Sequence, residues 1–161
     1  MVLGIAGGNG LEHIDKNKYQ KVYGIDINTE YLKAVEERYS DISEILECIQ
    51  VNLIDETSKL PNAELLVANL LIEYIGYDGF QKTVEHVCPQ ICFMYYSDKY
   101  RWQLGIWFAI YSCIYKIDEV HHQMEENLLI QAMKDIGYNL IAQTENLLPN
   151  GKKLVQLDFS C

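Results

Sequence analysis

The sequence has little positive charge and no long hydrophobic run. It contains 13 Lys and Arg against 23 Asp and Glu in 161 residues, which gives a net charge of −10. An acidic chain repels phosphate backbones, so no nucleic-acid partner is expected. The longest apolar stretch covers residues 104–115. It is shorter than the roughly 20 residues that a bilayer-spanning helix needs, so no membrane partner is expected either.

No signal peptide is expected, and the cysteines are odd in number. The first residues of the chain, MVLGIAGG, have no basic flank and run directly into glycines. The odd number of cysteines within apolar runs predicts reduced, buried thiols and a cytoplasmic location. Cys88 and Cys92 are spaced CxxxC, but no second pair follows them, so no metal is expected. The five cysteines are Cys48, Cys88, Cys92, Cys113 and Cys161.

What is present is enough for a folded core. The chain is 49% hydrophobic and 11% aromatic, which disfavours intrinsic disorder. Its length suits one domain, and no repeat, linker or low-complexity tract divides it. We therefore expect a single domain over residues 1–161.

Short apolar runs alternate with amphipathic stretches along most of this domain. Strands are expected at residues 2–6, 21–26, 46–53, 64–69 and 91–96. Helices are expected at residues 11–15, after Asn28 or Thr29, before Pro89 and over residues 122–136. This alternation predicts an α/β domain with a parallel sheet and helices on both faces.

The C-terminal part follows a different pattern. Two further β-like runs, at residues 140–147 and 154–159, flank Asn150-Gly151. An Asn-Gly pair tolerates the positive φ of a tight turn, so these runs predict an antiparallel hairpin. The complete prediction is a doubly wound, Rossmann-like domain with a seven-stranded mixed sheet. Ligands in such sheets bind at the carboxyl ends of the strands.

A glycine-rich segment follows the first predicted strand. Gly7, Gly8 and Gly10 allow the backbone to turn sharply and to approach a ligand closely. Asp26 ends the second predicted strand, where a carboxylate can accept hydrogen bonds from the two hydroxyls of a ribose. Together these features predict a nucleoside-cofactor site. The third glycine of a GxGxxG dinucleotide motif is missing, which makes a nicotinamide oxidoreductase the weaker alternative.

These motifs resemble those of the class I S-adenosylmethionine-dependent methyltransferases. VLGIAGGNG resembles the first motif of that family, YGIDIN the second, QVNL the end of the third strand, and ELLVANLLIEYI the fourth-strand motif. The resemblance covers essentially the whole chain and implies S-adenosyl-L-methionine as the cofactor. The cofactor-binding residues that it implies are Ala6, Gly7, Gly8, Gly10, Asp26, Ile27, Asn52, Leu53 and Asn69.

Three departures from the family pattern leave an alternative open. Gly4 stands where the family often has an acid, and Ala6 replaces the first glycine. The sequence also begins at its first predicted strand, whereas members of that family usually carry helices before it. We therefore expect a cofactor cleft that is open or is closed by a second subunit, as in a homodimer. The alternative function is a catalytically inactive, cofactor-binding regulatory or partner subunit of the same fold.

Methyl transfer from a sulfonium needs alignment more than a dedicated catalytic group. The sequence therefore identifies no certain catalytic residue, and its weak candidates are Tyr74, His121 and His122. Tyr74 is better explained by packing than by catalysis. The aromatic residues between Asp98 and His122 are equally explained by a substrate pocket and by core packing or a subunit interface. The acidic composition favours a small-molecule acceptor over a nucleic acid and leaves a protein acceptor open; the sequence does not identify the acceptor.

Overall fold

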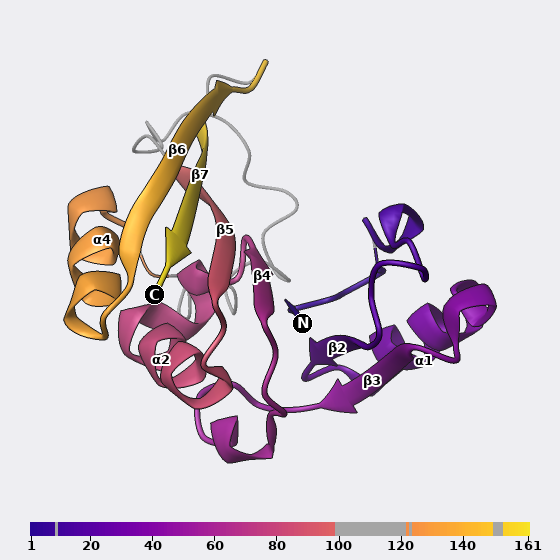
Figure 1. The fold of residues 1–161 in the computed structure, drawn as a ribbon. Coiled ribbons are helices and arrows are strands. Elements are labelled where there is room, and N and C mark those ends of the chain that lie inside the picture. Colours follow the sequence, from indigo (N-terminus) through magenta and orange to yellow (C-terminus); the bar gives the residue numbers. More distant parts are fainter. Residues whose placement is uncertain (9, 99–121, 123, 150–152) are drawn as a thin grey trace, which may run out of the picture.

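The computed structural model describes residues 1–8, 10–98, 122, 124–149 and 153–161. Within these residues the chain forms a seven-stranded sheet in the order β3-β2-β1-β4-β5-β7-β6 (Figure 1). The strands are β1 Val2–Leu3, β2 Val22–Asp26, β3 Leu46–Gln50, β4 Leu65–Asn69, β5 Ile91–Asp98, β6 Asn139–Leu147 and β7 Lys153–Ser160. Strands β1 to β5 are parallel, and β7 is antiparallel to β5 and β6. The predicted mixed sheet is confirmed.

The described helices follow the predicted apolar periodicity. The α-helices are α1 Thr29–Arg38, α2 Ile72–Val87 and α4 Glu126–Asp135, and the short 3-10 helices are η1 Leu11–His13, η2 Ser40–Ile42 and η3 Thr57–Lys59. Asn28 caps α1, because its side chain accepts a hydrogen bond of 2.9 Å from the Glu30 N–H. Glu126 lies in the first turn of α4, where its negative charge complements the helix dipole.

Two separate cores show that helices cover both faces of the sheet. In β2, Val22 packs into one core with Leu32 and Val35 of α1. Ile25, on the opposite face of the same strand, packs into the larger core that includes residues of α2 and α4. Because side chains alternate across a strand, α1 lies on one face of the sheet, and α2 and α4 lie on the other. Figure 1 shows α1 beside β3, far from α4.

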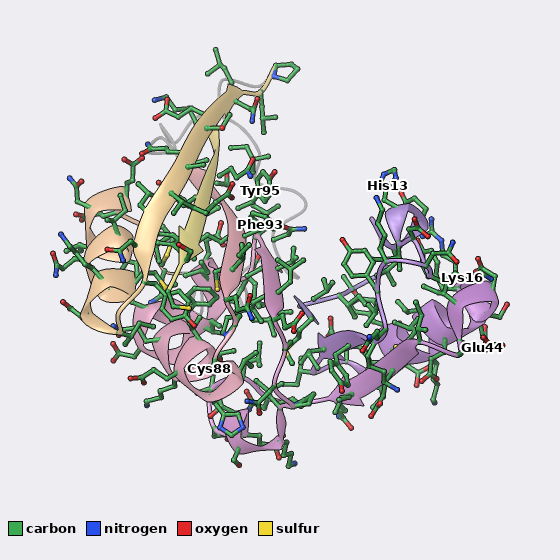
Figure 2. All side chains as sticks on the ribbon, in the orientation of Figure 1. His13, Lys16, Glu44, Cys88, Phe93 and Tyr95 are labelled. Atoms are coloured by element: carbon green, nitrogen blue, oxygen red, sulfur yellow. The ribbon has the colours of Figure 1, made fainter. Side chains whose placement is uncertain are left out.

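Part of the sheet contributes to neither core. Along β5, Cys92, Met94 and Tyr96 are buried in the larger core, whereas Phe93 and Tyr95 point to the other face and are half-buried. Figure 2 labels these two aromatic residues along β5. Among the described residues, Phe93 and Tyr95 neither belong to the two cores nor pack against them. Among the described helices, none combines the length and apolarity of a membrane span.

The largest differences from the predicted element boundaries occur at β1, β3 and α4, each for a local reason. Strand β1 ends at Leu3 and not at residue 6, because the residues that follow it adopt positive φ angles. Strand β3 ends at Gln50, since the Asn52 carbonyl accepts the N–H groups of a turn. Helix α4 begins at Glu126 and not at His122, whose N–H instead donates to the Glu73 carbonyl over 2.6 Å.

The expectation that the cysteines are buried is wrong for two of them. Cys92 is buried and Cys48 is half-buried, but Cys88 and Cys161 are exposed. Cys88 caps the C-terminus of α2 with a φ of 52°, so it lies beyond the apolar stripe of that helix (Figure 2). Cys161 is the last residue of the chain. Cys113 lies outside the described residues.

Candidate functional site

The candidate site begins where β1 turns away from the sheet. Leu3 pairs with Ile25 of β2 on one side and with Ala68 of β4 on the other. Asp26 and Asn69, the next residues along β2 and β4, therefore lie on either side of the turning chain. The strand order reverses between β1 and β4, which is the position where doubly wound sheets bind their ligands.

Residues 4–10, which we call the glycine bend, leave β1 through four left-handed residues. The φ angles are +63° at Gly4, +45° at Ala6, +75° at Gly8 and +101° at Gly10. Hydrogen bonds of 2.8 Å from the Gly8 N–H to the Ile5 carbonyl and of 3.1 Å from the Leu11 N–H to the Gly8 carbonyl close the bend. Asn9 lies outside the described residues.

The glycines of the bend serve two different purposes. A Cβ at Gly8 would lie 2.7 Å from Tyr39 Cε2 and 3.1 Å from Val35 Cγ2, so this glycine is required by packing. A Cβ at Gly7 or Gly10 would have no atom within 4 Å. These two glycines therefore border open space, as expected where a backbone approaches a ligand.

Asp26 is directly joined to the bend. Its Oδ2 accepts a hydrogen bond of 2.9 Å from the Ala6 N–H, and its Oδ1 accepts one of 2.9 Å from the Asn28 N–H. Each carboxylate oxygen can accept a second hydrogen bond, because it has two lone pairs. The acid and the bend that the sequence placed at one site are thus in contact, and the half-buried carboxylate keeps acceptor capacity for a ligand.

A second set of contacts, which sequence reasoning missed, holds the bend from its other side. Glu12 Oε2 accepts the Gly10 N–H at 2.7 Å and the Tyr39 hydroxyl at 3.1 Å. Hydrogen bonds from its own N–H, from the Gly10 N–H and from Tyr39 lower the pKa of Glu12. Arg38 Nη1 donates to the Gly7 carbonyl at 3.2 Å. The only sequence signal for these contacts was the position of Glu12, which is separated from Gly10 by Leu11 alone.

The ends of β2 and β3 present apolar side chains beside Asp26. Ile27 is 61% exposed, and Ile54 is 58% exposed in the turn after β3. Asn52 organises that turn, because its Oδ1 accepts the Ile54 N–H at 3.1 Å and its own N–H donates to Glu56 Oε2 at 3.1 Å. Leu53 differs from the others, since its side chain is buried in the core and only its main chain remains for a ligand.

The end of β4 contributes Asn69 and the start of α2. Asn69 is exposed, and the next residue, Leu70, is 46% exposed with a φ of +54°. Tyr74, in the first part of α2, retains 40% of its surface and lies outside the buried core. Asn69 thus lies at the sheet edge next to the bend.

His122 lies near this helix, whereas His121 and the aromatic residues from Tyr100 to Tyr115 lie outside the described residues. The His122 ring is 3.5 Å from the position that a Cβ on Gly76 would occupy. Gly76 has non-helical angles and kinks α2. A hollow of about 360 Å³ opens at this kink, lined by Ile75, Gly76, Tyr77, Asp78 and His122. No group of three or more potential metal ligands occurs among the described residues.

Comparison with solved structures defines the fold. The methyltransferase domain of a bacterial Hen1 protein matches with a TM-score of 0.70 and 17% identity, over 99% of this chain and 87% of that one. Magnesium protoporphyrin IX methyltransferase from Synechocystis, solved with bound S-adenosylhomocysteine, matches with a TM-score of 0.69 and 12% identity over 99% and 71% of the two chains. The [4+2]-cyclase SpnF matches with a TM-score of 0.72 and 7% identity over 99% and 73%.

These likenesses show that the chain has the fold of the class I S-adenosylmethionine-dependent methyltransferases. The sequence itself matches no protein-family model and no curated protein. The shared fold places the glycine bend and Asp26 at the carboxyl edge of the sheet, but it does not define the reaction.

Proposed function

We propose that this chain binds S-adenosyl-L-methionine at the glycine bend. The observation that carries the proposal is the hydrogen bond of 2.9 Å between the Ala6 N–H and Asp26, beside the open space at Gly7 and Gly10. Asp26 would accept hydrogen bonds from the ribose hydroxyls. Ile27, which follows β2, and Ile54, in the turn after β3, would contact the adenine ring. The S-adenosylhomocysteine bound to the Synechocystis enzyme supports this choice of cofactor.

The remaining contacts follow from position along the sheet edge. The bend residues Ala6, Gly7, Gly8 and Gly10 would contact the methionine part, together with Asn69. Asn52 and the main chain of Leu53 would reach the adenine from the end of β3. When bound, this cofactor supplies a methyl group already activated by a sulfonium. The residues of this chain then need to hold and orient the acceptor and to exclude water.

The reaction that we propose is methyl transfer to a small-molecule acceptor. The strongly acidic composition and the hollow at the α2 kink support a small acceptor over a nucleic acid. Tyr74 and His122 are the described residues from which a proton-accepting group would come, because both lie near the start of α2 at the edge where β4 ends.

Isothermal titration calorimetry with S-adenosylhomocysteine tests cofactor binding without any knowledge of the acceptor. We expect binding with one site per chain and no binding of NADH under the same conditions. Absence of heat at millimolar S-adenosylhomocysteine would remove the proposal. Stabilisation of the fold by NADH alone would instead favour an oxidoreductase.

A second candidate function is cofactor binding without methyl transfer. Gly4 and Ala6 stand where the family motif has an acid and a glycine, and one solved structure with this fold is described as a cyclase. A chain of this second type would bind the cofactor, yet would release no S-adenosylhomocysteine from S-adenosylmethionine with any acceptor. A methyl-transfer assay over a panel of small acceptors separates the two functions.

A further inference from the structure

Glu73 is a buried acid that the cofactor site does not use. It lies in the first turn of α2, and only 2% of its surface is exposed. Its Oε1 accepts a hydrogen bond of 2.8 Å from the Ser97 N–H. Its Oε2 is buried and has no hydrogen-bond partner among the described residues. A buried acceptor without a partner is costly, and in native proteins it calls for an explanation.

The pairing of β4 with β5 explains the hydrogen bond that Glu73 Oε1 accepts. Strand β4 ends at Asn69, whereas β5 continues to Asp98. The Ser97 N–H therefore lies beyond the last residue of β4 that pairs with β5. Glu73 Oε1 takes the place of the missing β4 carbonyl. A neutral glutamine would accept the same hydrogen bond, so the ladder requires neither the negative charge nor the second oxygen.

A hollow lies close to the main chain of Glu73. The main-chain carbonyl of Glu73 accepts the His122 N–H, which brings the segment before α4 against the start of α2. The hollow of about 360 Å³ lies close by along α2, and its lining includes Ile75 and the acid Asp78 but not Glu73 itself. Its volume falls within the range of small-molecule sites, about 300–1,000 Å³. The net charge of −10 attracts cations and repels anions.

We propose that Glu73 determines the specificity for the methyl acceptor by binding a cationic nitrogen of that acceptor through Oε2. The acceptor is then a small molecule that carries an ammonium or guanidinium group. Such a group supplies both the missing hydrogen-bond donor and the opposite charge that a buried carboxylate requires. This inference rests on the proposed methyl transfer, and it names the class of acceptor.

Matched pairs of small probes test the inference at neutral pH. The pairs are methylammonium and methanol, benzylammonium and benzyl alcohol, and guanidinium and urea, each at millimolar concentration. Binding is followed by ligand-observed NMR, with and without saturating S-adenosylhomocysteine. We expect at least one cation to bind about tenfold or more tightly than its neutral partner. Absence of such a preference in all three pairs overturns the inference, and this comparison needs no mutant.

Two variants assign the preference to Glu73. In Glu73→Gln, which keeps an oxygen for the Ser97 N–H, we expect the preference for the cation to fall about tenfold or more. Glu85→Gln removes the same charge from an exposed position on the same helix and should leave the preference unchanged. An equal preference in Glu73→Gln and wild type overturns the inference.

The cofactor measurement separates this inference from the proposed function. S-adenosylhomocysteine should bind Glu73→Gln within about twofold of wild type, since Glu73 is assigned to the acceptor. A parallel loss of S-adenosylhomocysteine affinity would place Glu73 in the cofactor site and overturn the inference. Failure of wild type to bind S-adenosylhomocysteine would instead remove the proposed function, whatever the probes show.

Discussion

Replacement of Asp26 by alanine should weaken cofactor binding without unfolding the chain. In the structure the carboxylate accepts the Ala6 and Asn28 N–H groups, and both hydrogen bonds lie at the exposed edge of the sheet. Water can therefore solvate these donors in the variant. The loss expected for the cofactor is that of two charge-assisted hydrogen bonds from ribose hydroxyls, together about 2–3 kcal/mol. That energy corresponds to a roughly 30- to 150-fold increase in Kd.

The assay is calorimetric titration of S-adenosylhomocysteine into wild type and variant, with circular dichroism as a check on folding. Asp26→Asn retains one neutral acceptor oxygen and should fall between wild type and Asp26→Ala. Asp135→Ala, in the last turn of α4, removes the same charge far from the bend and should not change Kd. A folded Asp26→Ala variant with a Kd within twofold of wild type would refute the assignment of the ribose contact.

Three further results are expected from the same structure. Gly8→Ala should lower the free energy of unfolding by about 1–3 kcal/mol, because its Cβ would lie 2.7 Å from a Tyr39 carbon at a φ of +75°. Gly7→Ala should leave thermal stability unchanged and weaken S-adenosylhomocysteine binding; an equal loss of stability in both variants would contradict the distinction. Burial raises the pKa of the Cys92 thiol to about 12, so at pH 8 iodoacetamide should label the exposed Cys88 far faster, as peptide mass spectrometry can measure. The pKa of Glu12 is lowered in the folded state, so its contribution to stability is present above its ordinary value of 4.5 and is lost as pH falls below it. The melting temperature of Glu12→Gln should accordingly depend less on pH between about 6 and 3.5 than that of wild type.

The sequence predicted the sheet because each strand carries its own local signal. Alternating apolar runs and helical stripes define the parallel part, and the two β-like runs near the C-terminus define the hairpin. Asn28 as a helix cap depends on a contact only two residues away. The pairing of a glycine turn with Asp26 could also be predicted, since neighbouring parallel strands end at the same edge.

Contacts between distant parts of the chain were decided only by the tertiary structure. Arg38 reaches the bend from the end of α1, Leu53 turns into the core, and Glu73 is buried beneath the end of β5. Local patterns carry no information on these positions, because burial depends on which elements pack together. The sequence by itself determined which residues meet at the proposed cofactor site. Packing decided which groups hold the glycine bend and which buried carboxylate oxygen has no hydrogen-bond partner among the described residues.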